Sequence, residues 1–198
     1  MGKFIAFESP YISQSGRASR IASSALSKVV SNVVHTFDHT EACQKLEQEI
    51  IHGHYPEFSK LAFRMAQVAD CSRHVTRSKE YGSTVLVTQW LDHIYARFIS
   101  GKSLSDITLF DAFYKKVSEE CGEPDLVVYI EPDLSDDPSG YLGSMHSAYI
   151  DIFDGRSNVV TVNPQAPDFE CRIRQIVLSV VTKKRNASSS HSRLGEQG

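Results

Sequence analysis

Short, continuous runs of apolar residues alternate with segments of helical periodicity along most of the chain. Five runs are rich in β-branched residues and are predicted to be strands: KFIAFE (3–8), NVVHTF (32–37), STVLV (83–87), DLVVYI (125–130) and NVVTVN (158–163). Strands that are apolar throughout are typical of a parallel sheet covered by helices on both faces. The pattern therefore predicts an α/β fold with three layers, doubly wound around a five-stranded parallel sheet.

The segments between these runs carry apolar residues every three or four positions, which predicts amphipathic helices. The expected helices cover residues 17–30, 41–51, 58–78, 91–99, 109–117, 142–152 and 168–181. The first is expected to begin near Gly16 or Arg17. Gly122 is expected to end the fifth, because glycine readily adopts the left-handed conformation that closes a helix.

Composition is consistent with one globular domain followed by a tail. The chain has 198 residues, of which 41% are hydrophobic, and a formal net charge of −3, which argues against a protein that coats nucleic acid. Residues 1–182 are predicted to form the domain. Residues 183–198, rich in serine, lysine and arginine, are predicted to be a disordered tail. A contact with nucleic acid is expected only through this basic tail.

The cellular compartment is inferred from what the sequence lacks. No apolar run approaches the roughly 20 residues of a membrane span, and the apolar stretch at the start is too short for a signal peptide. The cysteines, Cys43, Cys71, Cys121 and Cys171, are widely spaced, which favours reduced thiols and argues against a zinc site. We expect a cytoplasmic protein without a metal, with a nuclear location left open by Lys183, Lys184 and Arg185.

The first strand-to-helix turn is the foremost candidate for chemistry, because doubly wound folds bind ligands at the carboxyl ends of their strands. Here it reads ESPYISQSGR (residues 8–17). A phosphate-binding loop needs G-x-x-x-x-G-K-[ST], whose glycines let backbone N–H groups surround a phosphate and whose lysine neutralises charge. The turn lacks that pattern.

The opening MGKFIAFESPYISQSGR nevertheless resembles the start of a thymidylate kinase, G-K-F-I-V-F-E-G-x-D-G-x-G-K-[ST]-T-Q. Further segments resemble that family in order and spacing, at lower specificity: VVHTFDHTEACQKLEQEII, VADCSRHV, VLVTQW, EPDLVVYIEPD and NVVTVNPQAPDFECRIRQIV. The resemblance implies a P-loop kinase-like fold over nearly all of residues 2–182. It also implies homodimerisation and, in an active member, ATP and magnesium as cofactors.

The departures from the family pattern fall on its functional positions. In the phosphate loop, Ser9 stands for the first glycine, Gln14 and Ser15 for the second glycine and the lysine, and Gly16 and Arg17 for the [ST]-T pair. Residues at the acceptor side are also replaced, and the remaining candidates for that cleft are Asp38, Asp70, Arg73 and Gln89. The acidic stretch DDPSG (residues 136–140) stands where the family has an arginine-rich lid.

Phosphoryl transfer depends on positioning and on stabilisation by lysine, arginine and magnesium. The sequence therefore predicts a protein of this family that has lost kinase activity, has no catalytic residues and needs no cofactor. It would act as a structural, binding or assembly module, as a homodimer or as a subunit of a larger assembly. The alternative is a divergent, active dTMP kinase that uses ATP and magnesium, with Arg17 and Arg20 in place of the lost cations. Residues 9–15 are expected to form no phosphate-sized cradle, with Tyr11 or Gln14 filling the space.

Overall fold

The computed structural model describes residues 2–30, 33–36, 57–101, 104–135, 137 and 139–188. Its elements in chain order are β1 (Phe4–Glu8), α1 (Ile12–Leu26), β2 (Val33–Thr36), α3 (Glu57–Glu80), β3 (Thr84–Thr88), α4 (Leu91–Ser100), α5 (Leu104–Cys121), β4 (Leu126–Ile130), α6 (Tyr141–Phe153), β5 (Val159–Val162) and α7 (Phe169–Ser188). The helix expected over residues 41–51 lies outside the described residues.

The strands form one five-stranded sheet in the order β2-β3-β1-β4-β5, and every pair is parallel. β1 lies in the middle, with Ile5 opposite Leu86 of β3 and Leu126 of β4. Each predicted apolar run matches one of these strands to within one residue at either end, so the predicted five-stranded parallel sheet is confirmed. All carboxyl ends consequently lie along one edge, where the connections to the following helices begin.

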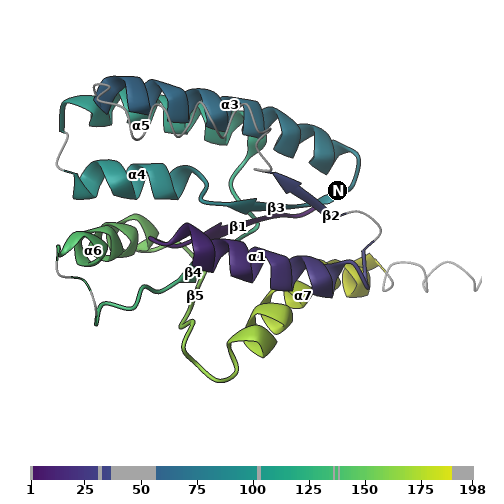
Figure 1. Cartoon of the computed structure of the whole chain (residues 1–198). Coiled ribbons are helices and arrows are strands. Elements are labelled where there is room, and N and C mark those ends of the chain that lie inside the picture. The colour runs from purple at the N-terminus through teal and green to yellow at the C-terminus, as the bar shows by residue number, and fades with distance from the viewer. Residues whose placement is uncertain are drawn as a thin grey trace, which may run out of the picture.

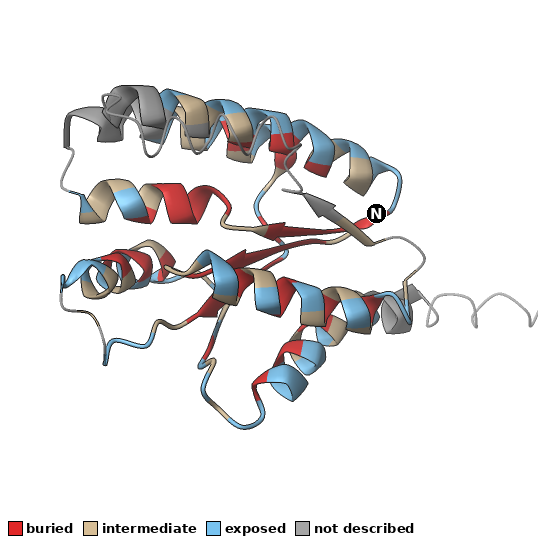
Figure 2. Cartoon of the chain, viewed as in Figure 1, coloured by how far each residue is buried: buried red, intermediate tan, exposed pale blue. Residues whose placement is uncertain are grey.

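Helices cover both faces of the sheet, as Figure 1 shows for α3, α4 and α5 on one side and α1 and α7 on the other. Alternate residues of β1 lie on opposite faces of the sheet, because successive side chains of a strand point in opposite directions. Phe4 and Ala6 pack with residues of α3, α4, α5 and α6, whereas Ile5 and Phe7 pack with residues of α1 and α7. The buried residues follow the sheet and the inward helix faces (Figure 2). The predicted three-layer, doubly wound fold is confirmed.

The ends of two helices differ from expectation. α1 begins at Ile12, so the prediction that it begins near Gly16 or Arg17 is wrong. α7 continues to Ser188, so the start of the expected tail is helical, and residues 189–198 lie outside the described part of the chain. The expected cap at Gly122 is confirmed: α5 ends at Cys121, and Gly122 has φ +74° and donates its N–H to the Ser118 carbonyl at 2.9 Å.

Among the described helices, none combines the length and the apolar character that a membrane span requires.

Candidate functional site

The carboxyl ends of β1 and β3 meet a buried group of polar side chains. Glu8 is the last residue of β1, Asp92 and His93 lie in the first turn of α4, Tyr149 lies on α6, and Arg156 follows α6. We call these five residues the buried carboxylate cluster. Its two carboxylates, Glu8 and Asp92, are 0% and 1% exposed. Such groups are rarely buried unless other groups of the protein satisfy them, so each set of contacts is informative.

Glu8 is held by hydrogen bonds from both neighbouring layers. The backbone N–H of Trp90 donates to Glu8 Oε1 at 2.8 Å, and the Tyr149 hydroxyl donates to Oε2 at 3.2 Å. The same hydroxyl lies 2.9 Å from His93 Nδ1. Burial raises the pKa of Glu8 well above its ordinary value of 4.5, and the nearby charge of Asp92 raises it further. Glu8 therefore retains its proton to a higher pH than an exposed glutamate does.

Asp92 forms an ion pair with Arg156, whose Nη1 lies 2.9 Å from Asp92 Oδ1. The Tyr114 hydroxyl donates to the same oxygen at 3.2 Å, and the Arg156 guanidinium lies over the ring of Phe153 at 5.4 Å. Burial raises the pKa of Asp92, and the charge of Arg156 partly opposes that rise. Asp92 Oδ2 and Arg156 Nε and Nη2 are buried without a hydrogen-bond partner among the described residues. The only guanidinium in the cluster is thus paired with a carboxylate.

The connection from β1 to α1 consists of Ser9, Pro10 and Tyr11. Pro10 has no N–H, and the Tyr11 N–H donates to Ser9 Oγ at 3.2 Å. Within the first turn of α1, Gln14 N and Ser15 N donate to the Tyr11 carbonyl at 3.2 and 3.3 Å. A phosphate loop needs several backbone N–H groups that face one anion. Here the early start of α1 uses the segment for helical hydrogen bonds.

The side chains of this segment bond to one another. Ser9 Oγ donates to Gln14 Oε1 at 3.1 Å, which places the Gln14 amide across the connection. Ser15, at the position where the resemblance places the lysine, is fully buried and donates its hydroxyl to the Ile12 carbonyl at 3.0 Å. Gly16 lies within α1. These hydrogen bonds join residues of the same segment.

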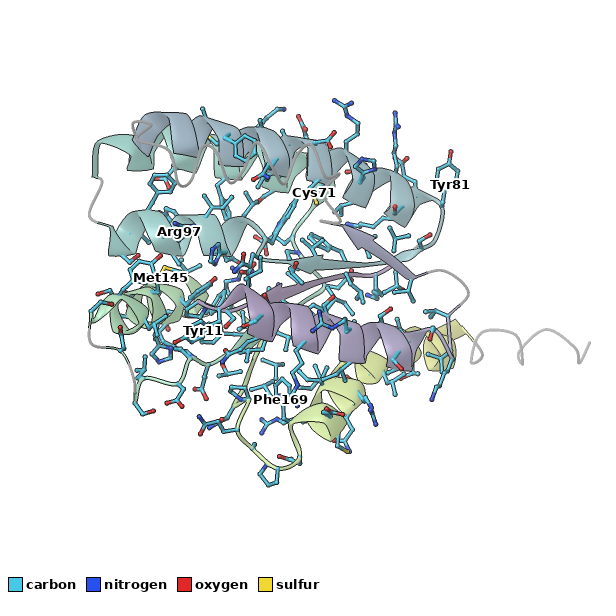
Figure 3. The ribbon with its side chains drawn as sticks, in the orientation of Figure 1. Tyr11, Cys71, Tyr81, Arg97, Met145 and Phe169 are labelled. Atoms are coloured by element: carbon cyan, nitrogen blue, oxygen red, sulfur yellow. The ribbon has the colours of Figure 1, made fainter. Side chains whose placement is uncertain are left out.

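Arg17 is exposed and connects α1 to α7. Its Nη2 lies 3.3 Å from Glu170 Oε1, and its guanidinium lies over the Phe169 ring at 5.1 Å. Figure 3 shows Phe169 between α1 and α7. The described contacts of Arg17 are therefore those of a residue that packs two helices together.

The acceptor-side candidates that the structure describes lie on α3 and directly after β3. Asp38 lies outside the described residues. Asp70 and Arg73 lie on the exposed side of α3, where Asp70 Oδ2 lies 3.9 Å from His74 Nε2. Gln89 follows β3 with φ +55°, and its N–H donates to the Phe7 carbonyl at 2.9 Å. Among the described residues, no group of three or more histidine, cysteine, aspartate or glutamate side chains forms a metal site.

The residues of the buried carboxylate cluster are not among the site residues predicted from the sequence. A signal was present for two of them: Glu8 ends an apolar strand without a break, and Asp92 follows the end of β3 closely. A charged residue directly after a buried strand lies at the ligand-binding edge of a doubly wound fold. No comparable signal marks Tyr149 or Arg156, which reach the cluster from α6 and from the turn after it.

The unusual backbone of Gln89 gives a first prediction. A left-handed conformation costs a residue with a side chain about 1–2 kcal/mol, whereas glycine adopts it freely but loses about 0.5–1 kcal/mol in chain entropy. Gln89→Gly should therefore raise the free energy of unfolding by about 0.5–1 kcal/mol, measured by urea denaturation. Thr88→Gly, at the adjacent position in β3, should lower it. A loss of stability in both variants would contradict the assigned strain.

The comparisons with known proteins bear on the fold. No protein-family model matches the sequence, and no curated protein matches it. Among solved structures, thymidylate kinase from Ehrlichia chaffeensis is similar, with a TM-score of 0.72 and 19% sequence identity over 91% of this chain and 99% of that chain. Thymidylate kinase from Candida albicans is similar with a TM-score of 0.64 and 13% identity, over 93% of each chain. The resemblance read from the sequence is therefore confirmed at the level of architecture: this chain has the fold of the thymidylate kinases.

Proposed function

We propose that this protein has the thymidylate kinase fold but transfers no phosphate, and that it acts as a structural, binding or assembly module. The observation that carries the proposal is the short connection between β1 and α1. Ser9, Pro10 and Tyr11 alone span it, and the following amides of Gln14 and Ser15 donate to the Tyr11 carbonyl. This segment offers no wide turn of backbone N–H groups for a nucleotide phosphate.

The charges at this edge also favour the proposal. ATP and dTMP carry several negative charges, and their reaction depends on cations placed around the transferred group. Glu8 and Asp92 lie instead at the strand ends. Arg156 is paired with Asp92 and Arg17 with Glu170. Buried carboxylates, beside arginines that already pair with carboxylates, disfavour the binding of a nucleoside triphosphate.

The role as a module is supported by the way Glu8 is held within the protein. Trp90 and Tyr149 donate hydrogen bonds to Glu8, and these bonds connect β1 with α6 and with the start of α4. These hydrogen bonds join separate layers of the fold. We propose that the scaffold is retained for its surface, as a homodimer or as a subunit of a larger assembly. Sedimentation velocity of the full chain should show a dimer, and a monomer at all concentrations would contradict homodimerisation.

Ligand binding tests the proposal. A ligand at 100 times its dissociation constant stabilises a protein by about 2.7 kcal/mol. We expect neither magnesium–ATP nor dTMP at millimolar concentration to raise the melting temperature or to release heat in calorimetry. An active thymidylate kinase measured in parallel shows that the conditions detect binding. Saturable binding of both ligands would contradict the proposal and support the divergent kinase.

A further inference from the structure

An open hollow of about 290 Å³ lies at the carboxyl ends of β4 and β5. One wall follows β4 and comprises residues 131–134, a second follows β5 and comprises residues 163–165, and His146 of α6 completes it. This edge is where a doubly wound sheet presents its ligand-binding connections. None of the residues in the buried carboxylate cluster lines the hollow, so it is a separate feature.

The hollow is rich in hydrogen-bond acceptors. Glu131 is half-buried, and its carboxylate makes no hydrogen bond or ion pair with any other described residue. Asp133 accepts hydrogen bonds from the Ser135 hydroxyl at 2.6 Å and from the Ser135 N–H at 2.9 Å, which lower its pKa and keep it ionised at neutral pH. Gln165 donates through Nε2 to Asp133, which leaves its amide oxygen Oε1 as an acceptor.

Charge complementarity selects the class of ligand. The described lining contains two carboxylates, Glu131 and Asp133, and neither lysine nor arginine. A phosphate or carboxylate ligand would be repelled, whereas a cation with many N–H donors would be attracted. Leu134, which is 46% exposed, provides apolar surface beside these acceptors together with Pro132 and Pro164. An alkyl stem that carries a cation can pack against such a surface.

We propose that this hollow binds the guanidinium group of a ligand. A guanidinium is planar, remains charged and presents five N–H donors in a fixed arrangement, which matches a free carboxylate with further acceptors beside it. Glu131 is the principal partner, and Asp133 and Gln165 add charge and acceptor oxygens. The source is either a free guanidino compound or an arginine side chain of a protein partner. This inference does not rest on the proposed loss of kinase activity.

NMR titration of the full chain in 150 mM salt tests the proposal with three probes. Agmatine represents a free guanidino compound, N-acetylarginine N-methylamide represents an arginine in a peptide, and N-acetylcitrulline N-methylamide is the uncharged isostere. We expect at least one arginine-like probe to give saturable amide shifts confined to the residues of the hollow that carry a backbone N–H: 131, 133, 134, 146, 163 and 165. The citrulline analogue should bind at least about tenfold more weakly, which corresponds to about 1.4 kcal/mol. Binding of agmatine points to a free compound, and binding of the peptide analogue alone points to a protein partner.

Two variants and a matched control localise the effect. Glu131→Gln should weaken binding by about tenfold or more, because it removes the free charge while it keeps the shape. Leu134→Arg should compete with the probe by placing a guanidinium beside the hollow. Glu120→Gln removes one negative charge near the end of α5, where Glu120 pairs with Lys116 at 3.4 Å, and should leave the affinity unchanged. The proposal is overturned by no saturable shift up to about 10 mM, by equal binding of the citrulline analogue, or by equal affinity in Glu131→Gln.

Discussion

Asp92→Leu should lower the free energy of unfolding by about 3–5 kcal/mol, because it removes one partner of a buried ion pair and leaves the other uncompensated. Arg156 Nη1 lies 2.9 Å from Asp92 Oδ1, and only 17% of the Arg156 side chain is exposed. Replacing both partners removes both charges, so Asp92→Leu combined with Arg156→Met should recover most of the loss. Urea denaturation of the two single variants and the double variant measures the coupling energy.

The exposed pair Lys116–Glu120 on α5 is the matched control, with its atoms 3.4 Å apart in consecutive turns of one helix. Lys116→Met and Glu120→Leu should each change stability by less than about 0.5 kcal/mol, because exposed helical pairs contribute little. Losses that simply add in the Asp92–Arg156 double variant would contradict a coupled buried pair. Such losses would indicate that Asp92 stabilises the fold through the hydrogen bond from the Tyr114 hydroxyl instead.

The second large effect concerns the pH dependence of stability. Burial raises the pKa of Glu8 above its ordinary value of 4.5, so the folded state holds a proton that the unfolded state releases. The stabilisation from this proton is complete below pH 4.5 and is lost as the pH rises toward the pKa of Glu8 in the folded state. Glu8→Gln cannot titrate, so its stability relative to the unchanged protein should increase over that range, by up to about 1.4 kcal/mol per pH unit.

Glu8→Ala separates the charge of Glu8 from its hydrogen bonds. Glutamine retains an oxygen for the Trp90 N–H, which donates to Glu8 Oε1 at 2.8 Å, whereas alanine leaves that donor buried and unpaired. Alanine should therefore cost about 1–3 kcal/mol at pH 5, with an additional loss from the cavity. Urea denaturation at several pH values measures both variants. Parallel pH profiles for Glu8→Gln and the unchanged protein would show that folding does not raise the pKa of Glu8.

The strands could be predicted from the sequence because their local pattern and their burial agree. β4 is apolar at every position and β1 at every position except Glu8, and the structure buries both strands completely. The start of α1 could not be predicted in the same way. Serine and proline in SPYISQS favour a turn, and the resemblance placed a loop over the same residues. The helix forms there because Ser9 Oγ accepts the Tyr11 N–H and orders the turn before Ile12.

The buried carboxylate cluster depends on contacts between residues that are far apart in sequence. Glu8 meets Trp90 across 82 positions and Tyr149 across 141, and Asp92 meets Arg156 across 64. No local spacing encodes such partners; they follow from the strand order, which places β1 between β3 and β4. The contact of Arg17 could not be predicted for the same reason, since its partner Glu170 lies on α7. Site residues that are predicted from motif position alone are therefore predicted without knowledge of the contacts that determine their roles.

The formation of dTDP from dTMP and magnesium–ATP tests the loss of phosphoryl transfer most directly. The full chain at high concentration is incubated with both nucleotides, and the product is followed by ³¹P NMR, with an active thymidylate kinase as the positive control. Because Ser9, Pro10 and Tyr11 alone connect β1 to α1, and because Arg17 and Arg156 are paired with carboxylates, we expect no dTDP above the rate without protein. Production of dTDP at a rate proportional to protein concentration, and retained through further purification, would contradict the account and establish a kinase that works without the usual phosphate loop.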